Sequence, residues 1–388
     1  MHILYIFTSG HFFSPNNKRW FKLFQEQLDI RVSVLIQEPQ EAVKKKFKSL
    51  YGNHFNVLYF QNEKNFLTKN YIKKFRYLKT VARKIDQLNP DVIHIHGLFF
   101  IYLALPLFFL KSRPKIVMNL WGSDFNSMYH KKLKNKLILR WLLKKSHMIW
   151  TTWLAMGDSL RAKFPKYTGK IRTIPLGVTN ELFLRSSEKD IRSIRNRFTI
   201  NPDEYLMIYT RGFVMNSNYH KIIKALSNIK KDLRYKVIFH HFRSKPEMDQ
   251  YLKQLINAHG LHEKVVISHS ELADKEMKAL YELADLTFSL TEKEQFSRTI
   301  QEAILSDTHL ILNDIEPYRY LKYFFNWNVD LVDVNDAEQL GSKIQYYITQ
   351  QPKPDWKYEK TFIEKIFKFE DKEELFKSVY QDLMDEKR

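Results

Sequence analysis

The sequence predicts an α/β protein made of two doubly wound domains, each built on a parallel sheet. Its 388 residues are enough for two separate hydrophobic cores. Short apolar, β-rich runs alternate with helical runs, and this alternation forms two series along the chain. Strands buried on both faces read as near-continuous apolar runs, so each series indicates a sheet with helices on both sides.

The first series is expected to begin at the N-terminus. Residues 1–7 lack the basic start and small-residue cleavage site of a signal peptide, so they are interpreted as a buried strand. Strands of this half are predicted at His2–Phe7, Val32–Ile36, Val92–His96, Ile116–Leu120, Met148–Thr152 and Ile171–Ile174. Helices are predicted between them, near residues 17–28, 68–88, 98–111, 129–145 and 156–165. The longest apolar run, Leu98–Leu110, is shorter than the roughly 18 residues of a membrane span and is expected to be a buried helix.

The second series follows the motif Pro175-Leu-Gly-Val178 and a polar, Arg-rich stretch. Its strands are predicted at Leu206–Tyr209, Val237–His240, Val265–Ile267, Leu286–Leu290, Leu310–Leu312 and Val329–Val332. The predicted domains are therefore residues 1–180 and 181–360. A charged helical tail, residues 361–388, is expected to pack back toward the first domain.

The charge of the chain is concentrated in its first half. Residues 1–180 carry 31 Lys and Arg against 9 Asp and Glu, whereas residues 181–388 carry 32 against 34. This asymmetry predicts an anionic partner for the first half: nucleic acid, an acidic polymer or a membrane surface. Cysteine is absent, which excludes disulfides, thiolate metal sites and cysteine nucleophiles and is consistent with a reducing compartment.

Three segments of the first half mix cations with aromatic residues: 44–48, 73–79 and 131–145. Singly, such segments are typical of solvated faces, but three in one domain indicate a directed surface. For 131–145 two interpretations stay open. It is either an interfacial helix on an anionic membrane, with Trp141 at the interface, or a partly buried helix with a solvated Lys face.

The stretch around Glu294 and Glu302 is the most informative part of the chain. It has the order of a βαβ unit: a strand to Leu290, a loop, a helix from about Ser297 and a second strand at Leu310–Leu312. Ligands bind beyond the carboxyl ends of such strands. Glu294 lies in that loop and Glu302 lies in the helix. The Ser297 hydroxyl suits a helix N-cap, and the helix start offers backbone N–H groups to a phosphate.

The two carboxylates in this frame resemble the E-x7-E signature of retaining GT-B glycosyltransferases, in particular glycosyltransferase family 4. Five further segments resemble the same family in the same order, over the chain from Met1 to about Val334. They are Asp91-Val-Ile-His-Ile-His-Gly97, Asn119-Leu-Trp-Gly-Ser-Asp124, Thr173-Ile-Pro-Leu-Gly-Val178, Tyr209-Thr-Arg-Gly212 and Ala279-Leu-Tyr-Glu-Leu-Ala-Asp285. The resemblance implies a GT-B fold, in which two Rossmann-like domains face each other across a cleft.

The resemblance also implies roles for individual residues. Glu294, His96 and Asp124 would be catalytic. Residues implied in binding the nucleotide sugar are Gly10, Trp121, Arg211, Gln295, Phe296, Ser297, Arg298, Thr299 and Glu302. Arg211 and the helix start would hold the diphosphate, Glu302 the ribose hydroxyls and Glu294 a sugar hydroxyl. No cofactor or metal is expected, because no Asp-x-Asp occurs and no third ligand accompanies His94 and His96.

The implied function is transfer of a sugar to a lipid-linked or growing surface glycan, by a cytoplasmic protein bound peripherally to the inner face of the plasma membrane. The chain departs from the family pattern at several places: the glycine-rich loop after the first strand is reduced to Ser9-Gly10, and His309 replaces a Pro. Asn216, Ser217 and Asn218 stand where a Lys-Gly pair is usual, Trp121 replaces a common His, and Asp307 replaces a Gly. A second hypothesis is therefore a catalytically silent GT-B subunit. Nucleic-acid binding would explain the charge, but no nucleic-acid motif is present.

Overall fold

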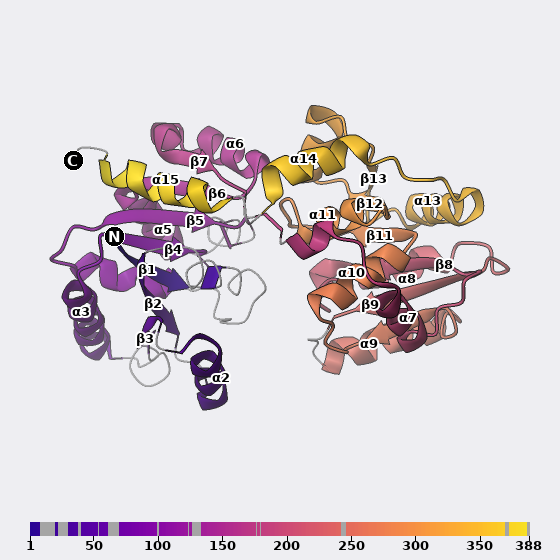
Figure 1. Ribbon diagram of the computed structural model, residues 1–388, viewed down its shortest axis with the longest axis horizontal. Coiled ribbons are helices and arrows are strands. Elements are labelled where there is room, and N and C mark those ends of the chain that lie inside the picture. Colours follow the sequence, from indigo (N-terminus) through magenta and orange to yellow (C-terminus); the bar gives the residue numbers. More distant parts are fainter. Residues whose placement is uncertain are drawn as a thin grey trace. The chain divides into compact units, whose positions relative to one another are not determined.

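The chain forms two compact units, shown in Figure 1. The first comprises Met1–Pro175 with Asp371–Arg388, and the second comprises Leu176–Glu370. The computed structural model describes residues 1–7, 20–21, 30–37, 40–52, 54–60, 70–98, 101–122, 124–125, 133–175, 177–178, 180–241, 246–368 and 372–385. No helix in these ranges is both long and apolar enough to cross a membrane.

The first unit contains a seven-stranded parallel sheet with the order β3-β2-β1-β4-β5-β6-β7. Its strands are β1 (His2–Phe7), β2 (Arg31–Gln37), β3 (Asn56–Phe60), β4 (Val92–His96), β5 (Lys115–Leu120), β6 (Met148–Thr151) and β7 (Ile171–Thr173). Six of them match predicted strands. The strand β3 is missing from the prediction because it lies at the sheet edge, where Val57, Leu58 and Tyr59 are only partly buried and leave a weak apolar signal.

The helices of the first unit mostly follow the prediction. They are α2 (Glu41–Tyr51), α3 (Tyr71–Leu88), the 3₁₀ helix η2 (Ile101–Phe109), α5 (Leu133–Lys145), α6 (Leu154–Lys163), the 3₁₀ helix η3 (Pro165–Lys170) and the C-terminal α15 (Glu373–Asp385). The helix α2 is not among the predicted ones. The expected helix at 98–111 is a 3₁₀ helix instead, and it contains Pro106, which is disfavoured inside an α-helix. Apart from Trp20 and Phe21, the helix predicted at 17–28 lies outside the described residues.

Alternation along β1 separates two chemically different faces of this sheet. Leu4 and Ile6 belong to an aliphatic core that also contains buried residues of α3, η2, α5 and α6. Tyr5 and Phe7 point to the opposite face, where their rings contact Trp20 and Phe21 respectively. The helices α3, η2 and α5 therefore cover one face of the sheet.

The C-terminal helix α15 packs on the polar-aromatic face. The Tyr380 hydroxyl lies 2.5 Å from the Tyr5 hydroxyl and 2.6 Å from Nδ1 of His94, and all three side chains are buried. Phe376 stacks on Trp20 with ring centroids 5.0 Å apart. Burial, together with the neighbouring His96, lowers the pKa of His94, so its imidazole is neutral at pH 7. This hydrogen-bonded chain joins α15 to β1 and β4.

The second unit contains a six-stranded parallel sheet with the order β10-β9-β8-β11-β12-β13. Its strands are β8 (Tyr205–Tyr209), β9 (Tyr235–His240), β10 (Val265–Ser268), β11 (Leu286–Ser289), β12 (His309–Asn313) and β13 (Asp330–Val332), each of which overlaps a predicted strand. Its α-helices are α7 (Glu188–Arg197), α8 (Tyr219–Leu226), α9 (Pro246–Ala258), α10 (Asp274–Leu283), α11 (Arg298–Leu305), α12 (Glu316–Arg319), α13 (Ala337–Gln350) and α14 (Lys357–Phe367). Shorter turns are η4 (Asn180–Phe183), η5 (Met215–Ser217) and the π-helical η6 (Tyr320–Phe324). Two parallel sheets with alternating helices confirm the predicted fold class.

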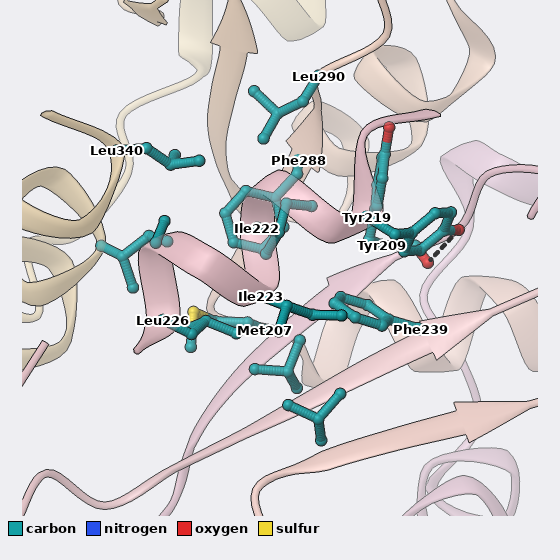
Figure 2. Close-up of a cluster of buried hydrophobic side chains, with 14 of the residues drawn as sticks. Met207, Tyr209, Tyr219, Ile222, Ile223, Leu226, Phe239, Phe288, Leu290 and Leu340 are labelled. Atoms are coloured by element: carbon teal, nitrogen blue, oxygen red, sulfur yellow. Dashed lines mark hydrogen bonds between the residues drawn. The ribbon is translucent and has the colours of Figure 1, made fainter. Parts of the chain in front are cut away.

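The core of the second unit lies between this sheet and the helices α8, α9 and α13 (Figure 2). Ile222, Ile223 and Leu226 of α8 are buried together with Met207 and Phe239 of the strands. The close packing of α8 on α13 requires a glycine, because a Cβ on Gly341 would approach the carbonyl oxygen of Ala225 to 2.9 Å.

A buried lysine fixes the C-terminal end of α11. Lys278 of α10 donates hydrogen bonds to the carbonyl oxygen of Leu305 at 2.9 Å and to the Ser306 hydroxyl at 3.1 Å. Its ammonium group also pairs with Glu282 at 3.4 Å. A cation at this end satisfies free carbonyl groups and complements the helix dipole. Lys278 thus fixes the C-terminal end of α11. The opposite, N-terminal end is the one that the sequence analysis assigns to phosphate binding.

The contact of α15 generates a stability prediction. Tyr380→Phe removes the hydroxyl shared by Tyr5 and His94, and leaving a buried polar group without a partner costs about 1–3 kcal/mol. We expect the free energy of urea unfolding to fall by that amount. The control is Tyr358→Phe, at a side chain that is 60% exposed, which should change it by less than about 0.5 kcal/mol. Equal stability of the two variants would contradict the role given to this hydrogen-bonded chain.

Candidate functional site

Two neighbouring strands of the second unit end at one edge of the sheet, and the loops that follow them meet there. The strands are β8 and β11, and the loops carry Arg211 and Glu294. The Arg211 guanidinium and the Glu294 carboxylate form a hydrogen-bonded ion pair. Burial would lower the pKa of Arg211, but the Glu294 carboxylate raises it, and the net result lies above the usual value. The structure therefore brings these two predicted site residues together.

The backbone beside Arg211 is held by a residue that the sequence did not reveal. The buried Tyr219 hydroxyl accepts a hydrogen bond from the Arg211 amide at 3.1 Å and donates one to the Arg211 carbonyl at 2.5 Å. Asn218, with a left-handed φ of 59°, donates from its side chain to the Leu290 carbonyl at 2.7 Å. The Asn itself is the one sequence signal for a turn here, because Asn tolerates a left-handed backbone conformation. Tyr219 thus holds the Arg211 backbone within its own loop, and Asn218 joins this loop to the one that follows β11.

The helix α11 begins where the sequence predicts, directly after Ser297. Ser297 has the extended backbone of an N-cap, but among the described residues its hydroxyl makes no capping hydrogen bond, so the predicted cap interaction is wrong. Ser297 and Thr299 at this helix start are both buried. The positive end of the helix dipole still lies at this position.

The second carboxylate of the pair, Glu302, lies one turn into α11 and is buried. Its Oε1 accepts a hydrogen bond from Nε of Arg298 at 2.6 Å, and Nη2 of Arg298 lies 3.2 Å from Oδ1 of Asp274. Burial would lower the pKa of Arg298, whereas Glu302 and Asp274 raise it above the usual value. Glu294 and Glu302, the two carboxylates predicted to bind the sugar and the ribose, are therefore each paired with an Arg that is predicted to bind phosphate.

The remaining predicted residues of this loop serve different purposes. The backbone N–H of Gln295 donates to Oε1 of Glu294 at 3.0 Å and thus orients that carboxylate. The Phe296 ring lies 4.8 Å from the Phe367 ring and 5.5 Å from the Trp327 ring. These contacts give Phe296 a packing role within the second unit.

In the first unit, Asp124 and His96 lie at the carboxyl edge of the sheet and are fully buried. The Asp124 carboxylate accepts hydrogen bonds from the backbone amides of Leu98 at 2.8 Å, Trp121 at 3.0 Å and Phe125 at 2.7 Å. Burial raises the pKa of Asp124 to about 6, although these hydrogen bonds oppose the shift. Asp124 therefore joins the loops that follow β4 and β5.

The His96 ring contacts the edge of Trp121, with centroids 4.8 Å apart. Burial lowers the pKa of His96 to about 3, so its imidazole is neutral at pH 7. Gly10 lies outside the described residues. Within the described ranges, no group of three or more His, Asp or Glu is placed to hold a metal ion.

This arrangement suits a phosphorylated ligand with several hydroxyl groups. Guanidinium groups and helix starts bind phosphate oxygens, and carboxylates accept hydrogen bonds from hydroxyl groups. Both chemical types are present in the second unit, and an Arg that binds a phosphate there would exchange one anionic partner for another.

Comparison with known families matches both halves of the chain. Residues 190–368 match the family model described as glycosyl transferases group 1. Residues 24–182 match the model described as glycosyltransferase family 4.

One curated relative is the GDP-mannose:cellobiosyl-diphosphopolyprenol alpha-mannosyltransferase of Xanthomonas oryzae pv. oryzae. It is 23% identical over 232 residues, which cover 59% of this chain and 57% of the relative. The match thus spans little more than half of the relative's length.

Solved structures resemble the chain over nearly its whole length. A glycosyltransferase from Rickettsia africae has a TM-score of 0.78 and 16% identity, with 100% of this chain and 99% of that chain covered. HepE from Anabaena, solved in complex with UDP and glucose, has a TM-score of 0.77 and 16% identity, with 98% and 100% covered. At these identities the likeness shows the fold.

The low pKa of His96 generates a pH prediction. In the unfolded chain His96 takes up a proton at its ordinary pKa of about 6.5, whereas in the folded protein it stays neutral down to about pH 3. The contribution of His96 to the free energy of unfolding is therefore complete above about pH 6.5 and is lost as the pH falls toward 3. Asp124 has the opposite sign, since its raised pKa favours the folded state at low pH. We expect His96→Asn to reduce the loss of unfolding free energy between pH 7 and pH 5 by about 2 kcal/mol.

The measurement is urea unfolding of the wild type and the variant at both pH values. The pH dependence, and not the stability at pH 7, is the readout, since the substitution also alters packing. The exposed His54 provides the control variant His54→Asn. The same pH dependence in His96→Asn and the wild type would show that the folded protein does not suppress protonation of His96.

Proposed function

The chain belongs to the family 4 type of GT-B glycosyltransferases, and from this premise we propose that it is a retaining enzyme that transfers a sugar from a nucleotide-sugar donor to a lipid-linked or growing surface glycan. The observation that carries the proposal is the pairing of Arg211 with Glu294 and of Arg298 with Glu302. These four side chains combine diphosphate binding with hydroxyl binding in one unit.

The donor would be bound by the second unit. Arg211 and the start of α11 would hold the diphosphate, with Arg298 as a further cation. Glu294 would accept a hydrogen bond from a hydroxyl of the donor sugar, and Glu302 from the ribose. When the sugar–phosphate bond breaks, negative charge grows on the leaving diphosphate. Fixed N–H groups and a guanidinium stabilise that charge with little reorganisation.

The ligand-free pairing defines what donor binding must change. Arg211 and Glu294 neutralise each other, and the pair is only partly exposed, at 29% and 19% of the two side chains. A diphosphate would replace Glu294 as the anionic partner of Arg211. The Glu294 carboxylate, released from Arg211, would then be available to the sugar hydroxyl. This exchange links sugar recognition to diphosphate binding.

For the first unit we propose acceptor binding. His96 would act as a neutral hydrogen-bonding group, because its pKa of about 3 keeps it uncharged. Asp124 would act as a positioning residue, since its carboxylate is already engaged by three backbone amides. Trp121 would pack against His96 and limit its orientation.

The acceptor class is supported by the curated relative and by charge. The name of that relative states an acceptor in which the sugar is carried on a polyprenol diphosphate. The surplus of Lys and Arg in residues 1–180 suits such an anionic, membrane-held acceptor. We accordingly place the protein in the cytoplasm, at the inner face of the plasma membrane.

A catalytically silent subunit is the second candidate, favoured by the absence of the Lys-Gly pair. Ser217 and Asn218 at this place make structural hydrogen bonds, to the carbonyls of Gly212 and Leu290, and leave Arg211 as the side-chain cation of the loop. Asp307, in contrast, gives no support to this candidate. It pairs with Lys360 at 2.6 Å and with Arg185 at 3.4 Å beyond the C-terminal end of α11. Hydrolysis of a nucleotide sugar by the purified chain would exclude a silent subunit.

The role of Glu294 is tested by Glu294→Gln. We expect sugar transfer and donor hydrolysis to fall by at least 100-fold, on the order of the effects of removing a transition-state contact. Binding of UDP or GDP, measured by calorimetry, should be unchanged or tighter, because Arg211 loses its competing carboxylate. The matched control is Glu292→Gln, two residues earlier at an exposed position. The assignment of Glu294 to the donor sugar would be contradicted if Glu294→Gln kept full activity. It would also be contradicted if the variant lost diphosphate binding together with activity.

Metal independence is tested by chelation together with Arg211. We expect turnover to persist in excess EDTA, because Arg211 and the start of α11 supply the positive charge. Arg211→Ala should weaken binding of the nucleoside diphosphate about tenfold or more, since a hydrogen bond to a charged group contributes roughly 1.5–3 kcal/mol. Turnover that vanishes in EDTA and returns with Mg²⁺ or Mn²⁺ would contradict the proposal.

A further inference from the structure

Six large apolar side chains of the first unit are exposed on three neighbouring elements. Tyr71 is 82% exposed, Leu133 71% and Ile72 64%. The six belong to α3, η2 and α5 and are Tyr71, Ile72, Phe75, Phe108, Leu133 and Leu137. Surfaces of soluble proteins carry such residues singly, so a group of this size calls for a binding partner.

Ring contacts make this group continuous. The Phe75 ring of α3 lies 4.9 Å from the Phe109 ring, and the adjacent Phe108 stacks on Trp141 of α5 at 3.6 Å. On α5, Leu133, Leu137 and Trp141 are spaced by four residues and therefore lie on one side of the helix. The outer surface of α3, η2 and α5 is thus a single apolar strip, which we call the α3–η2–α5 surface.

The segments that carry or adjoin this strip are rich in cations and almost free of acidic residues. Residues 71–88, 101–115 and 133–145 contain fourteen Lys and Arg and a single acidic residue, Asp86. The Asp86 carboxylate is engaged by the backbone amides of Lys111 and Ser112 and by the Ser112 hydroxyl. Lys79 lies over the Phe75 ring at 4.5 Å and Lys74 over the Tyr71 ring at 5.6 Å. On α3, cationic and aromatic side chains therefore lie side by side.

We propose that the α3–η2–α5 surface docks the protein on an anionic lipid bilayer, an inference that rests on the proposed lipid-linked acceptor. Apolar and aromatic side chains enter the boundary between headgroups and acyl chains, while flanking Lys and Arg contact anionic headgroups. The near absence of acidic residues favours a bilayer over a protein partner. A protein partner would need acidic groups at fixed positions opposite these cations, whereas a fluid anionic bilayer can neutralise them at any position.

One of the three basic segments noted in the sequence, residues 44–48, does not belong to this surface. The helix α2, which carries residues 44–48, packs through Phe47 and Tyr51 onto Phe21, and Phe21 contacts Phe7. It therefore covers the face of the sheet opposite to α3, η2 and α5. The expectation that all three segments form one directed surface is replaced by a surface made from 71–88, 101–115 and 133–145. The helix α2 becomes an internal control.

The experiment is cosedimentation of the full-length chain with vesicles of phosphatidylcholine, or of equal parts phosphatidylcholine and phosphatidylglycerol, at 0.1 and 0.5 M NaCl. We expect the wild type to bind the anionic vesicles at least tenfold more tightly than the neutral ones. Binding should weaken at the higher salt, because the surface field is screened within a Debye length. No preference for anionic vesicles would overturn the proposal.

Two pairs of matched variants locate the surface. Arg140→Glu/Lys144→Glu should weaken binding to anionic vesicles at least tenfold, and Lys45→Glu/Lys48→Glu on α2 should weaken it less than threefold. Leu133→Ser/Leu137→Ser should weaken it fivefold or more, and Leu50→Ser, at a side chain that is 50% exposed on α2, by less than twofold. Thermal unfolding confirms that each variant is folded. Equal losses in the α2 variants would overturn the assignment of the surface.

Calorimetry of the same variants with UDP or GDP, without vesicles, separates this inference from the proposed function. Normal nucleotide binding with unaltered vesicle binding in Arg140→Glu/Lys144→Glu would overturn the docking surface and leave the transferase proposal intact. A wild type that binds anionic vesicles but no nucleoside diphosphate would overturn the transferase proposal and keep the docking surface.

Discussion

The candidate site depends on the geometry of parallel strands, whose carboxyl ends lie at one edge of a sheet. Because β8 and β11 are neighbours, the loops after them must meet, although Arg211 and Glu294 are 83 residues apart in the chain. The ion pair between their side chains then links the two loops. The Tyr219 hydroxyl and the Asn218 amide add uncharged hydrogen bonds on the same loops. The backbone around the ion pair is therefore held by hydrogen bonds that do not involve the two charged groups.

The same edge in the first unit is organised differently. There a single carboxylate, Asp124, is surrounded by backbone amides, and two histidines are buried among aromatic rings. Burial keeps both imidazoles neutral, since their pKa values are lowered. The second unit thus concentrates charged side chains where phosphate chemistry is proposed. The first unit presents neutral hydrogen-bonding groups and keeps its many cations on the outer surface.

This outer surface gives the charge asymmetry of the chain a structural meaning. Two helices and a 3₁₀ helix on one face of the sheet bring together cations that lie as far apart as Lys73 and Lys145 in the sequence. Their buried sides build the aliphatic core with Leu4 and Ile6. Their outer sides remain apolar and basic. An element that needed only to cover the sheet would carry a polar exterior, so the exposed Leu133, Leu137 and Phe108 are additional to the demands of folding.

The sequence by itself determined the fold class, twelve of the thirteen strands found in the described residues and the frame of Glu294 and Glu302, because each depends on local apolar periodicity or on short-range order. It did not determine β3 or α2, whose partly exposed residues leave a weak pattern. Only the tertiary structure decided that Arg211 meets Glu294 and that Asp124 faces three amides. It alone placed α2 on the opposite face from α3 and α5. These contacts are set by strand order and crossover direction, which bring distant residues together and leave no local trace in the sequence.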